Sequence, residues 1–446
     1  MARGEPGIGG DIDVLVIGAG IIGVASAYHI LRNNPAKKVL VVDRYSAPGQ
    51  GNTGRSNAMF RNTFSSRDNQ TLSDCSIDFY LHVQEELRQD IGLQQIGYLW
   101  LMNEVQLSAS GPFLEGMASN GIEIRRYAQP DLASLIPELV SRPERRHDLL
   151  PLDLPKVDAG IFGPKCGRLD PDKLTRLYAK LFVELGGRFA FNTQVESLGV
   201  GPERRLGLDR EPFVWQEARV DGVQVTGQLT GVLRPKTVVL ACGAWGNGLL
   251  SPIGIDGHVR VKKRQLFSIA TQGSEALGRL VRTKGFNGLD LIPMMILPKC
   301  GVHFKPVAEE GAIWVACEDE INRPFLDQPE TDLDNYKAEL EFYEKSVKPV
   351  LTGYFPAFGP ARIKAMWAGL YSYNTVDYLP FVFRENNLIV VGGDSGSGIM
   401  KGDALGRIVD AVYREEEEAV LFGDRPYKTS RLSFDRRNVE REEWVI

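Results

Sequence analysis

The chain has 446 residues, a formal net charge of −5 at pH 7, 43% hydrophobic residues and 24% charged residues. These values are typical of a globular protein of two or three domains, and a chain without an excess of basic residues is a poor candidate for binding nucleic acid. No apolar run reaches the ~18 residues of a membrane-spanning helix, so no transmembrane segment is expected. Residues 1–11 lack the apolar core of a signal peptide and are expected to form a loose lead-in.

The cysteines and histidines point to no cross-link and no metal. The five cysteines are scattered without a Cys-x-x-Cys pair, which suits a reduced, cytoplasmic compartment. The five histidines form no His-Glu-x-x-His motif, so no metal site is expected. The short basic clusters at 142–146 and 262–264 are interpreted as solvated surface.

The first structured segment has the pattern of a dinucleotide-binding unit. A strand is expected over Asp13–Ile17, a helix over Ile21–Arg32 and a second strand over Lys38–Val42, which ends at Asp43. The glycines of the intervening Gly-x-Gly-x-x-Gly motif allow a tight turn, close approach of a pyrophosphate and packing of the helix on the strand, while the helix N-terminus offers free N–H groups. Asp43 is placed to accept hydrogen bonds from ribose hydroxyls. The residues of the motif are Gly18, Gly20, Ile21, Ile22 and Gly23.

Helices and strands alternate along the rest of the chain. The predicted elements are a loop at 50–67, a helix at 68–90, a strand at 97–102, a helix at 170–185, a strand at 188–192, a hairpin at 213–233 that turns at Asp221–Gly222, a buried strand at 237–241, short strands within 259–315, a helix at 333–347, a strand entering the glycine-rich turn at 387–398, and a closing helix at 398–413.

The second combination of strand, glycine turn and helix near the C-terminus indicates that the nucleotide-binding domain is discontinuous. We therefore predict an α/β fold with a Rossmann-like domain made from residues 12–95, 160–255 and 360–425. A mainly antiparallel β substrate or cap domain, residues 96–159 and 256–359, is inserted between these pieces. Residues 1–11 and 426–446 are expected to be flexible or peripheral tails.

Four stretches resemble the FAD-dependent D-amino-acid oxidase superfamily, in particular its branch of sarcosine oxidase, glycine oxidase and dimethylglycine dehydrogenase. They are the unit that ends at Asp43 and Arg44, the segment Gly51–Arg61, the strand and turn Val238–Trp245, and the loop Val390–Gly398. In this order and spacing, the resemblance extends over about residues 12 to 420.

The resemblance implies one FAD that extends from the N-terminal unit to the C-terminal loop. Some members of the branch attach the flavin through a cysteine or an early histidine; here Gly369 stands at the cysteine position, and residues 50–62 contain no histidine, so non-covalent FAD is expected. A helix N-terminus near Gly398 would stabilise negative charge on the reduced ring. The implied cofactor-binding residues are Gly18, Gly20, Ile21, Ile22, Gly23, Asp43, Arg44, Arg55, Ser56, Asn57, Val195, Cys242, Gly243, Trp245, Gly393, Asp394, Gly396, Ser397, Gly398, Ile399 and Met400.

The family oxidises a C–N bond by hydride transfer to flavin N5, so the resemblance also implies residues that orient an amine or amino-acid substrate. Arg61 stands where sarcosine oxidases carry the arginine that binds the substrate carboxylate, and a planar guanidinium suits that role. A surface arginine, or one that contacts the flavin instead, is the alternative. Lys401 resembles a second carboxylate ligand but stands one residue later, which on a helix turns a side chain by ~100°. Tyr371 aligns with a tyrosine of the substrate pocket, although a core aromatic residue remains the alternative.

The electron acceptor is predicted from the stretch Lys299–Lys305. Oxidases of this branch hold a lysine over the flavin, and the corresponding position here is closer to His303 than to Lys305. This favours a dehydrogenase that passes electrons to a carrier over an oxidase that uses oxygen. A 2-hydroxy-acid or glycerol-phosphate dehydrogenase of the same superfamily, and a flavin-bearing assembly factor of a respiratory complex, remain alternatives. Either a homo-oligomer or a hetero-oligomer is compatible with the sequence.

Overall fold

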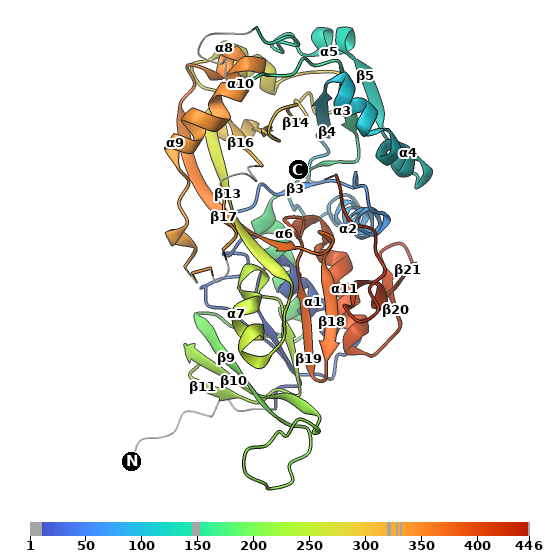
Figure 1. Cartoon of the computed structure of the whole chain (residues 1–446), viewed down its shortest axis with the longest axis vertical. Helices are drawn as coiled ribbons and strands as arrows, with labels where there is room; N and C mark the ends of the chain where they lie inside the picture. The colour runs from blue at the N-terminus through green and yellow to red at the C-terminus, as the bar shows by residue number, and fades with distance from the viewer. Residues whose placement is uncertain (1–10, 145–151, 319–322, 327–328, 331, 445–446) are drawn as a thin grey trace.

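A computed structural model describes residues 11–144, 152–318, 323–326, 329–330 and 332–444 (Figure 1). The predicted lead-in falls almost wholly on residues 1–10, which lie outside the described residues, as do residues 145–146 of the first basic cluster. The described chain forms two parts, each around its own sheet, which are stacked along the vertical axis of Figure 1. No helix within the described ranges is long and apolar enough to cross a lipid bilayer.

The lower part is built on a sheet of six strands within the described residues, in the order β18-β19-β12-β1-β2-β8. All neighbours are parallel except β18 and β19, which are antiparallel. The central strands are apolar at almost every position because both faces of the sheet are covered. The strands are β1 (Val14–Ile17), β2 (Val39–Val42), β8 (Arg188–Ala190), β12 (Thr237–Leu240), β18 (Phe381–Glu385) and β19 (Leu388–Gly392).

Alternate residues of these strands enter two different cores. Val14 and Val16 of β1 pack with helices on one face, and Leu15 and Ile17 pack with a three-stranded antiparallel sheet on the other. The helices are α1 (Ile21–Asn33), α2 (Arg67–Glu85), α6 (Pro171–Glu184) and α11 (Gly402–Tyr413). The strands of the smaller sheet are β9 (Thr193–Pro202), β10 (Ala218–Gly227) and β11 (Gly231–Leu233).

The upper part surrounds a largely antiparallel sheet in the order β17-β13-β16-β15-β14-β4-β6-β5, in which only β14 and β4 pair in parallel among the described strands. Two of its strands, β13 and β17, continue down into the lower part (Figure 1). The strands are β4 (Tyr98–Met102), β5 (Arg125–Ala128), β6 (Ala159–Gly163), β13 (Val259–Ala270), β14 (Met294–Ile296), β15 (His303–Val307), β16 (Ala312–Ala316) and β17 (Ile363–Asn374).

Short elements complete the two parts. The remaining helices are α3 (Glu104–Ala109), α4 (Gly111–Ser119), α5 (Gln129–Leu135), α7 (Gly246–Leu250), α8 (Glu275–Val281), α9 (Leu340–Phe342) and α10 (Lys348–Tyr354). Two strand pairs lie outside the large sheets, namely β3 (Met59–Phe60) with β7 (Gly167–Arg168) and β20 (Glu418–Leu421) with β21 (Arg425–Lys428).

The α/β fold class with a separate antiparallel sheet is confirmed, but two local predictions are wrong. The predicted hairpin at 213–233 is formed by β10 and β11, but it turns at residues 228–230. Asp221 and Gly222 lie inside β10, where the pairing register with β9 shifts as in a bulge. The predicted helix at 333–347 begins instead as a single 3₁₀ turn, and α9 starts only at Leu340. The intervening chain stays extended because Lys263 and Gln265 of β13 hold Lys337 and Glu339 by hydrogen bonds.

The C-terminal residues also differ from the expected flexible or peripheral tail 426–446. Arg437 forms an ion pair with Asp377, and Glu442 and Trp444 are buried between the two parts. These contacts join residues far apart in the sequence, so a periodic pattern of hydrophobic residues does not predict them.

Candidate functional site

The main cavity has a volume of about 710 Å³ and lies at the carboxyl ends of β1, β2, β12 and β19, against the lower ends of β13 and β17. This edge of a parallel sheet is where ligands bind in open α/β folds. Most of the predicted cofactor-binding residues line it: Gly18, Gly20, Ile21, Ile22, Asp43, Arg44, Arg55, Ser56, Asn57, Val195, Cys242, Gly243, Trp245, Asp394, Gly396, Gly398 and Ile399. Four do not: Gly23, Gly393, Ser397 and Met400.

One end of the cavity is formed by the turn between β1 and α1. Gly18 has a φ of +106°, and a side chain at Gly23 would place its Cβ 1.9 Å from the Gly18 carbonyl oxygen, so this turn requires both glycines. Asp43 accepts hydrogen bonds from the backbone N–H groups of Ala19, at 2.6 Å, and Tyr45, at 2.8 Å. Burial raises the pKa of Asp43, and these two N–H groups oppose that effect. The turn therefore holds a carboxylate beside a helix N-terminus.

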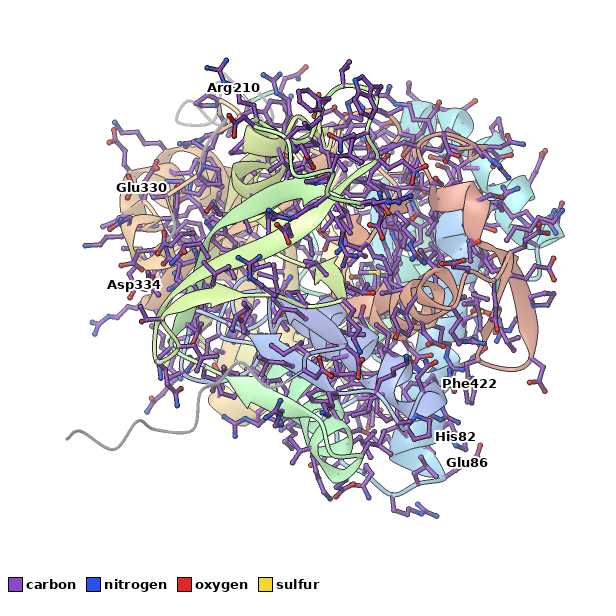
Figure 2. The ribbon with its side chains drawn as sticks, turned by 90° about the horizontal axis from the view of Figure 1, so that it is seen from below. His82, Glu86, Arg210, Glu330, Asp334 and Phe422 are labelled. Atoms are coloured by element: carbon purple, nitrogen blue, oxygen red, sulfur yellow. The ribbon has the colours of Figure 1, made fainter. Side chains whose placement is uncertain are left out.

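Aromatic and charged side chains close the outer wall at this end. The Arg44 guanidinium lies 4.0 Å from the centre of the Trp245 ring. The Trp245 indole donates a hydrogen bond to the Glu330 carbonyl, and Arg55 forms an ion pair with Asp334. Figure 2 shows Glu330 and Asp334 along the same edge of the molecule.

Buried polar atoms without partners indicate that the cavity is shaped for a polar ligand. The Tyr45 hydroxyl, Asn57 Oδ1 and Asn247 Oδ1 are buried and have no hydrogen-bond partner among the described residues, and all three residues line the main cavity. Because a buried polar atom without a partner is costly, these atoms leave hydrogen-bonding capacity beside the cavity for a ligand that carries several polar groups. An FAD molecule meets this requirement.

The other end of the cavity is formed by the loop after β19. Asp394 accepts a hydrogen bond from Ser372 at 2.5 Å, and a Cβ at Gly396 would lie 2.1 Å from the Tyr371 ring. The predicted helix at 398–413 begins as a 3₁₀ turn at Ile399–Lys401, and α11 starts at Gly402. This tighter turn changes where the side chain of Lys401 points.

A second, smaller cavity of about 90 Å³ adjoins the main one. Ser56, Asn57, Tyr371, Gly396 and Ile399 line both. Three of the four predicted catalytic residues, namely Arg61, Tyr371 and His303, line the small cavity, together with Ser397, Met400 and Glu442. The structure therefore brings these predicted substrate and cofactor residues to one place.

Arg61 is 6% exposed and faces this small cavity from the chain that follows β3. Its guanidinium donates hydrogen bonds to the carbonyl oxygens of Thr63, at 2.5 Å, and Trp444, at 2.7 Å. Its charged end also stacks on the Phe64 ring at 4.0 Å. Burial lowers the pKa of Arg61, but a guanidinium remains charged at physiological pH. The site thus contains an oriented, buried cation.

Lys401 lines neither cavity, so its predicted contact with a substrate carboxylate is not seen. Its ammonium donates to Asn69 Oδ1 and Ser397 Oγ, each at 2.5 Å, behind the wall that Ser397 presents to the small cavity. Burial lowers the pKa of Lys401 to about 7. The extra residue before Lys401 and the 3₁₀ turn explain why the side chain supports the loop instead of entering the pocket.

The two candidates on β15 face different surroundings. His303 Nδ1 lies 2.8 Å from the Gly301 carbonyl oxygen, and burial together with the nearby Arg264 lowers the pKa of His303 to about 4. Lys305 lines neither cavity; its ammonium donates to the Asn57 carbonyl and lies 4.5 Å from the centre of the Trp314 ring. Burial lowers the pKa of Lys305 to about 7.

Sequence reasoning missed two charged residues of the site. Arg264, on β13, lines the main cavity and donates to the Tyr373 hydroxyl; it is 7% exposed and its neighbour Lys262 is 2% exposed, so the cluster 262–264 is not solvated surface. The alternation of Lys262 and Arg264 on one strand face was the available signal. Glu442 lines the small cavity, and nothing in its local sequence pattern indicates this.

Comparisons with known proteins agree with this architecture. The family model DAO, FAD-dependent oxidoreductase, matches residues 13–411. The FAD-dependent oxidoreductase domain-containing protein 1 of Xenopus laevis is 24% identical over 436 residues, which cover 94% of this chain and 81% of that protein.

Solved structures share the fold. The L-proline dehydrogenase of P. horikoshii superposes with a TM-score of 0.70 at 21% identity, covering 91% of this chain and 94% of that one. The glycine oxidase of Geobacillus kaustophilus superposes with a TM-score of 0.67 at 17% identity, covering 91% of this chain and 95% of that one.

The parallel sheet with its glycine turn, the separate antiparallel sheet and the cavity at the carboxyl ends of the parallel strands are the arrangement of a dinucleotide-binding protein. The chain belongs to the DAO family of FAD-dependent oxidoreductases, which confirms the resemblance and the FAD expected from the sequence.

Proposed function

We propose that this flavoprotein oxidises the C–N bond of an amino acid or a secondary amine, with Arg61 as the ligand of the substrate carboxylate. The observation that carries the proposal is the position of Arg61, a buried guanidinium in a small cavity that adjoins the main cavity at Tyr371 and Gly396. A guanidinium binds a carboxylate through two parallel hydrogen bonds, which fixes both position and orientation.

In this proposal the chain's own residues bind and orient, and FAD supplies the hydride acceptor when it is bound. Asp43 would hold the ribose hydroxyls, and the N-terminus of α1 would face the pyrophosphate. The loop 393–398 and the turn that starts at Ile399 would contact the ring end. Tyr371 would form the wall between ring and substrate, since it lines both cavities.

We also propose that the FAD is held without a covalent bond. Gly369 lines the main cavity where a cysteine would attach the flavin in some relatives of the sarcosine oxidase branch. Cys242 is the single cysteine along this cavity among the described residues, and its thiol donates to the Ile17 carbonyl. Burial raises the pKa of Cys242 to about 12, which keeps it as an unreactive thiol.

We further propose a dehydrogenase that passes electrons to a carrier. Oxygen reduction by a flavin proceeds through an anionic intermediate, which a lysine over the flavin would stabilise in the oxidases that this chain resembles. Arg61 and Arg264 are cations of this site, but they are held by Trp444 and Tyr373 and do not stand at the position of that lysine. The histidine at the position that resembles the oxidase lysine is neutral near pH 7 because burial lowers the pKa of His303 to about 4, and Lys305 is held by Asn57 outside both cavities. The scattered cysteines, which form no Cys-x-x-Cys pair, support a cytoplasmic location.

A substrate panel tests the proposed reaction. The holoenzyme is mixed anaerobically with amino acids, N-methyl amino acids, 2-hydroxy acids and glycerol phosphate, and the visible absorbance of oxidised flavin is followed. Bleaching by an amine or amino acid is expected. Bleaching by hydroxy acids or glycerol phosphate alone would assign the chain to the alternative dehydrogenases, and no bleaching by any member would favour a non-catalytic role.

A further inference from the structure

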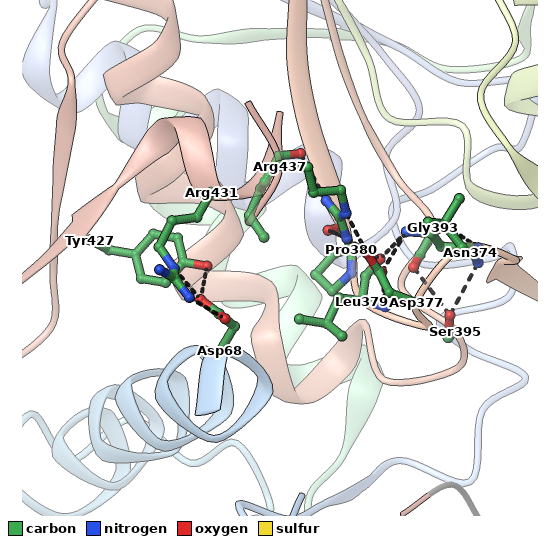
Figure 3. Close-up of polar contacts among 12 residues, drawn as sticks. Asp68, Asn374, Asp377, Leu379, Pro380, Gly393, Ser395, Tyr427, Arg431 and Arg437 are labelled. Atoms are coloured by element: carbon green, nitrogen blue, oxygen red, sulfur yellow. Dashed lines mark hydrogen bonds and ion pairs between the residues drawn. The ribbon is translucent and has the colours of Figure 1, made fainter. Parts of the chain in front are cut away.

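The last described residues, 433–444, form a segment that we name the C-terminal strap. Arg437 anchors it to Asp377 through hydrogen bonds of 2.5 and 2.7 Å and also donates to the Leu379 and Pro380 carbonyls. Figure 3 shows this cluster and, before the strap begins, a second anchor in which Arg431 pairs with Asp68. The strap therefore approaches the site from two fixed points on the lower part.

Near its end, the strap places the carboxylate of Glu442 at the start of α2. Glu442 is 3% exposed, and its oxygens accept hydrogen bonds from the backbone N–H and hydroxyl groups of both Ser65 and Ser66, and from the Asn69 amide. Burial would raise the pKa of Glu442, but the charge of Arg61 and these donors outweigh it and hold the pKa below its usual value. Glu442 is thus an ionised carboxylate that is hydrogen-bonded by the protein and lines the small cavity.

The same segment holds Arg61 directly. The Trp444 carbonyl, two residues after Glu442, accepts a hydrogen bond from Arg61 at 2.7 Å. The Trp444 ring packs edge-on against Trp100 of β4, with centroids 5.7 Å apart, and against Phe113 of α4 at 6.1 Å. Since these aromatic residues belong to the upper part, the strap fixes Arg61 against both parts of the molecule.

A hydrogen-bonded chain also joins the strap to the loop at the flavin end. Asn69 donates its amide to Glu442 and accepts from Lys401, and Lys401 donates to Ser397. Ser397 in turn donates to the Asp394 carbonyl. A change at Glu442 therefore reaches Arg61 through charge and backbone, and the loop 394–398 through Asn69 and Lys401.

We infer that Glu442 is a positioning residue that, with the Trp444 carbonyl, sets the orientation of Arg61 for a substrate carboxylate. The inference rests on the proposed carboxylate-binding role of Arg61. Two opposite effects are separable. If Glu442 acts by positioning, its neutralisation weakens carboxylate binding; if it acts only as a nearby negative charge, neutralisation removes a repulsion and strengthens binding.

The test compares Glu442→Gln with Glu443→Gln, which changes an exposed neighbour of the same charge. Acetate is titrated into the FAD-loaded enzyme, and its Kd is read from the perturbation of the flavin spectrum. We expect Glu442→Gln to raise the Kd for acetate and the KM for a carboxylated substrate by about tenfold or more, with a smaller change in kcat, and Glu443→Gln to change neither. The KM of a substrate analogue without a carboxylate should not move.

An unchanged or lower Kd for acetate in Glu442→Gln overturns the inference. If Arg61→Ala also leaves acetate binding unchanged, the proposed function fails as well; if Arg61→Ala abolishes binding while Glu442→Gln does not affect it, only the positioning role fails. Should Glu442→Gln not fold, Trp444→Ala decides, because it keeps Glu442 and the backbone carbonyl but removes the ring that anchors them. The same rise in Kd supports the inference, and wild-type binding contradicts it.

Discussion

At the scale of single residues, the hydrogen bonds of Arg61 decide what its replacement should do. Arg61→Lys keeps a charge but loses the two-pronged guanidinium, and Arg61→Ala loses both. In the alanine variant, the loss of a charge-assisted contact in a desolvated pocket should cost ~3–5 kcal/mol of transition-state stabilisation. This free energy corresponds to a decrease in kcat/KM of about two to four powers of ten. Steady-state kinetics with a carboxylated substrate and its decarboxylated analogue measure the effect.

The analogue is the internal control for Arg61, because it has no carboxylate to lose. Its disadvantage relative to the carboxylated substrate should disappear in Arg61→Ala, and FAD content should stay near that of the parent. Normal turnover of the carboxylated substrate, or a loss explained entirely by missing FAD, would contradict the assignment.

Asp43 offers a test of the cofactor end. The residue lines the main cavity, and its carboxylate accepts two backbone hydrogen bonds from the described part of the chain, so its oxygens retain capacity for ribose hydroxyls. Asp43→Ala should weaken FAD binding by about ten- to a hundredfold, from two lost hydrogen bonds of ~0.5–1.5 kcal/mol each. Fluorescence titration of the apoprotein with FAD measures this. Asp13→Ala, which alters the opposite end of β1, should bind FAD normally, and equal affinities of all three proteins would remove Asp43 from the ribose site.

Lys401 links burial to pH dependence. Burial lowers the pKa of Lys401 from 10.5 to about 7, so between these values the unfolded chain binds a proton that the folded chain does not. Below pH 7 the folded protein bears the whole free-energy cost of burying the charged ammonium, and this cost declines as the pH rises. The free energy of unfolding should therefore increase with pH by up to ~1.4 kcal/mol per pH unit for one such lysine. Urea unfolding at saturating FAD measures the free energy of unfolding at pH 7 and at pH 9. The increase between these two pH values should be smaller in Lys401→Met than in the parent.

The exposed Lys180 provides the control for this measurement, because Lys180→Met should leave the pH dependence unchanged. If Lys401→Met and the parent gain the same free energy of unfolding from pH 7 to pH 9, Lys401 is charged in the folded protein.

At the scale of elements, β15 determines the expected reaction with oxygen. His303 faces the small cavity, and because its pKa is lowered to about 4 it provides no cation at neutral pH. Reduced enzyme should therefore reoxidise in air at least about 10²-fold more slowly than with an artificial dye. Stopped-flow mixing of reduced enzyme with air-saturated buffer gives the rate. Reoxidation in air as fast as turnover would identify an oxidase.

The elements also show what could be predicted from the sequence. The β1–α1–β2 unit was predictable because Gly18, Gly23 and the apolar strands act through neighbours in the chain. The prediction of a turn at Asp221 was wrong because Asp-Gly is compatible with a turn and with a bulge. Which of the two forms depends on the pairing of β10 with β9. The positions of Lys401 and Glu442 depend on a one-residue shift and on contacts more than 300 residues apart, such as Asn69 with Lys401. A short stretch of sequence does not contain information about contacts between residues so far apart in the chain.

At the scale of the whole molecule, the cavity lies between the two parts and is lined by both, and the FAD that it fits should leave when they unfold. Acid precipitation should leave the yellow chromophore in the supernatant, because no covalent attachment is expected at Gly369 or Cys242. The absorbance spectra of supernatant and resuspended pellet measure the partition. Flavin that remains in the pellet would contradict the non-covalent assignment.

The long pair β13 and β17 has a mechanical consequence for the whole molecule. Their antiparallel pairing runs from Val259 with Asn374 to Ile269 with Ile363, with one register shift after Ser268, and so spans both parts. A rotation of the two parts against each other would have to bend or twist this two-stranded ribbon, because both strands cross from one part to the other. The ribbon and the cores packed on it resist such a distortion more than a loop does. We therefore expect substrate and product to exchange through local movements of the residues around the cavity, so that the space between those residues, and not a hinge angle, sets the largest molecule that the protein can admit.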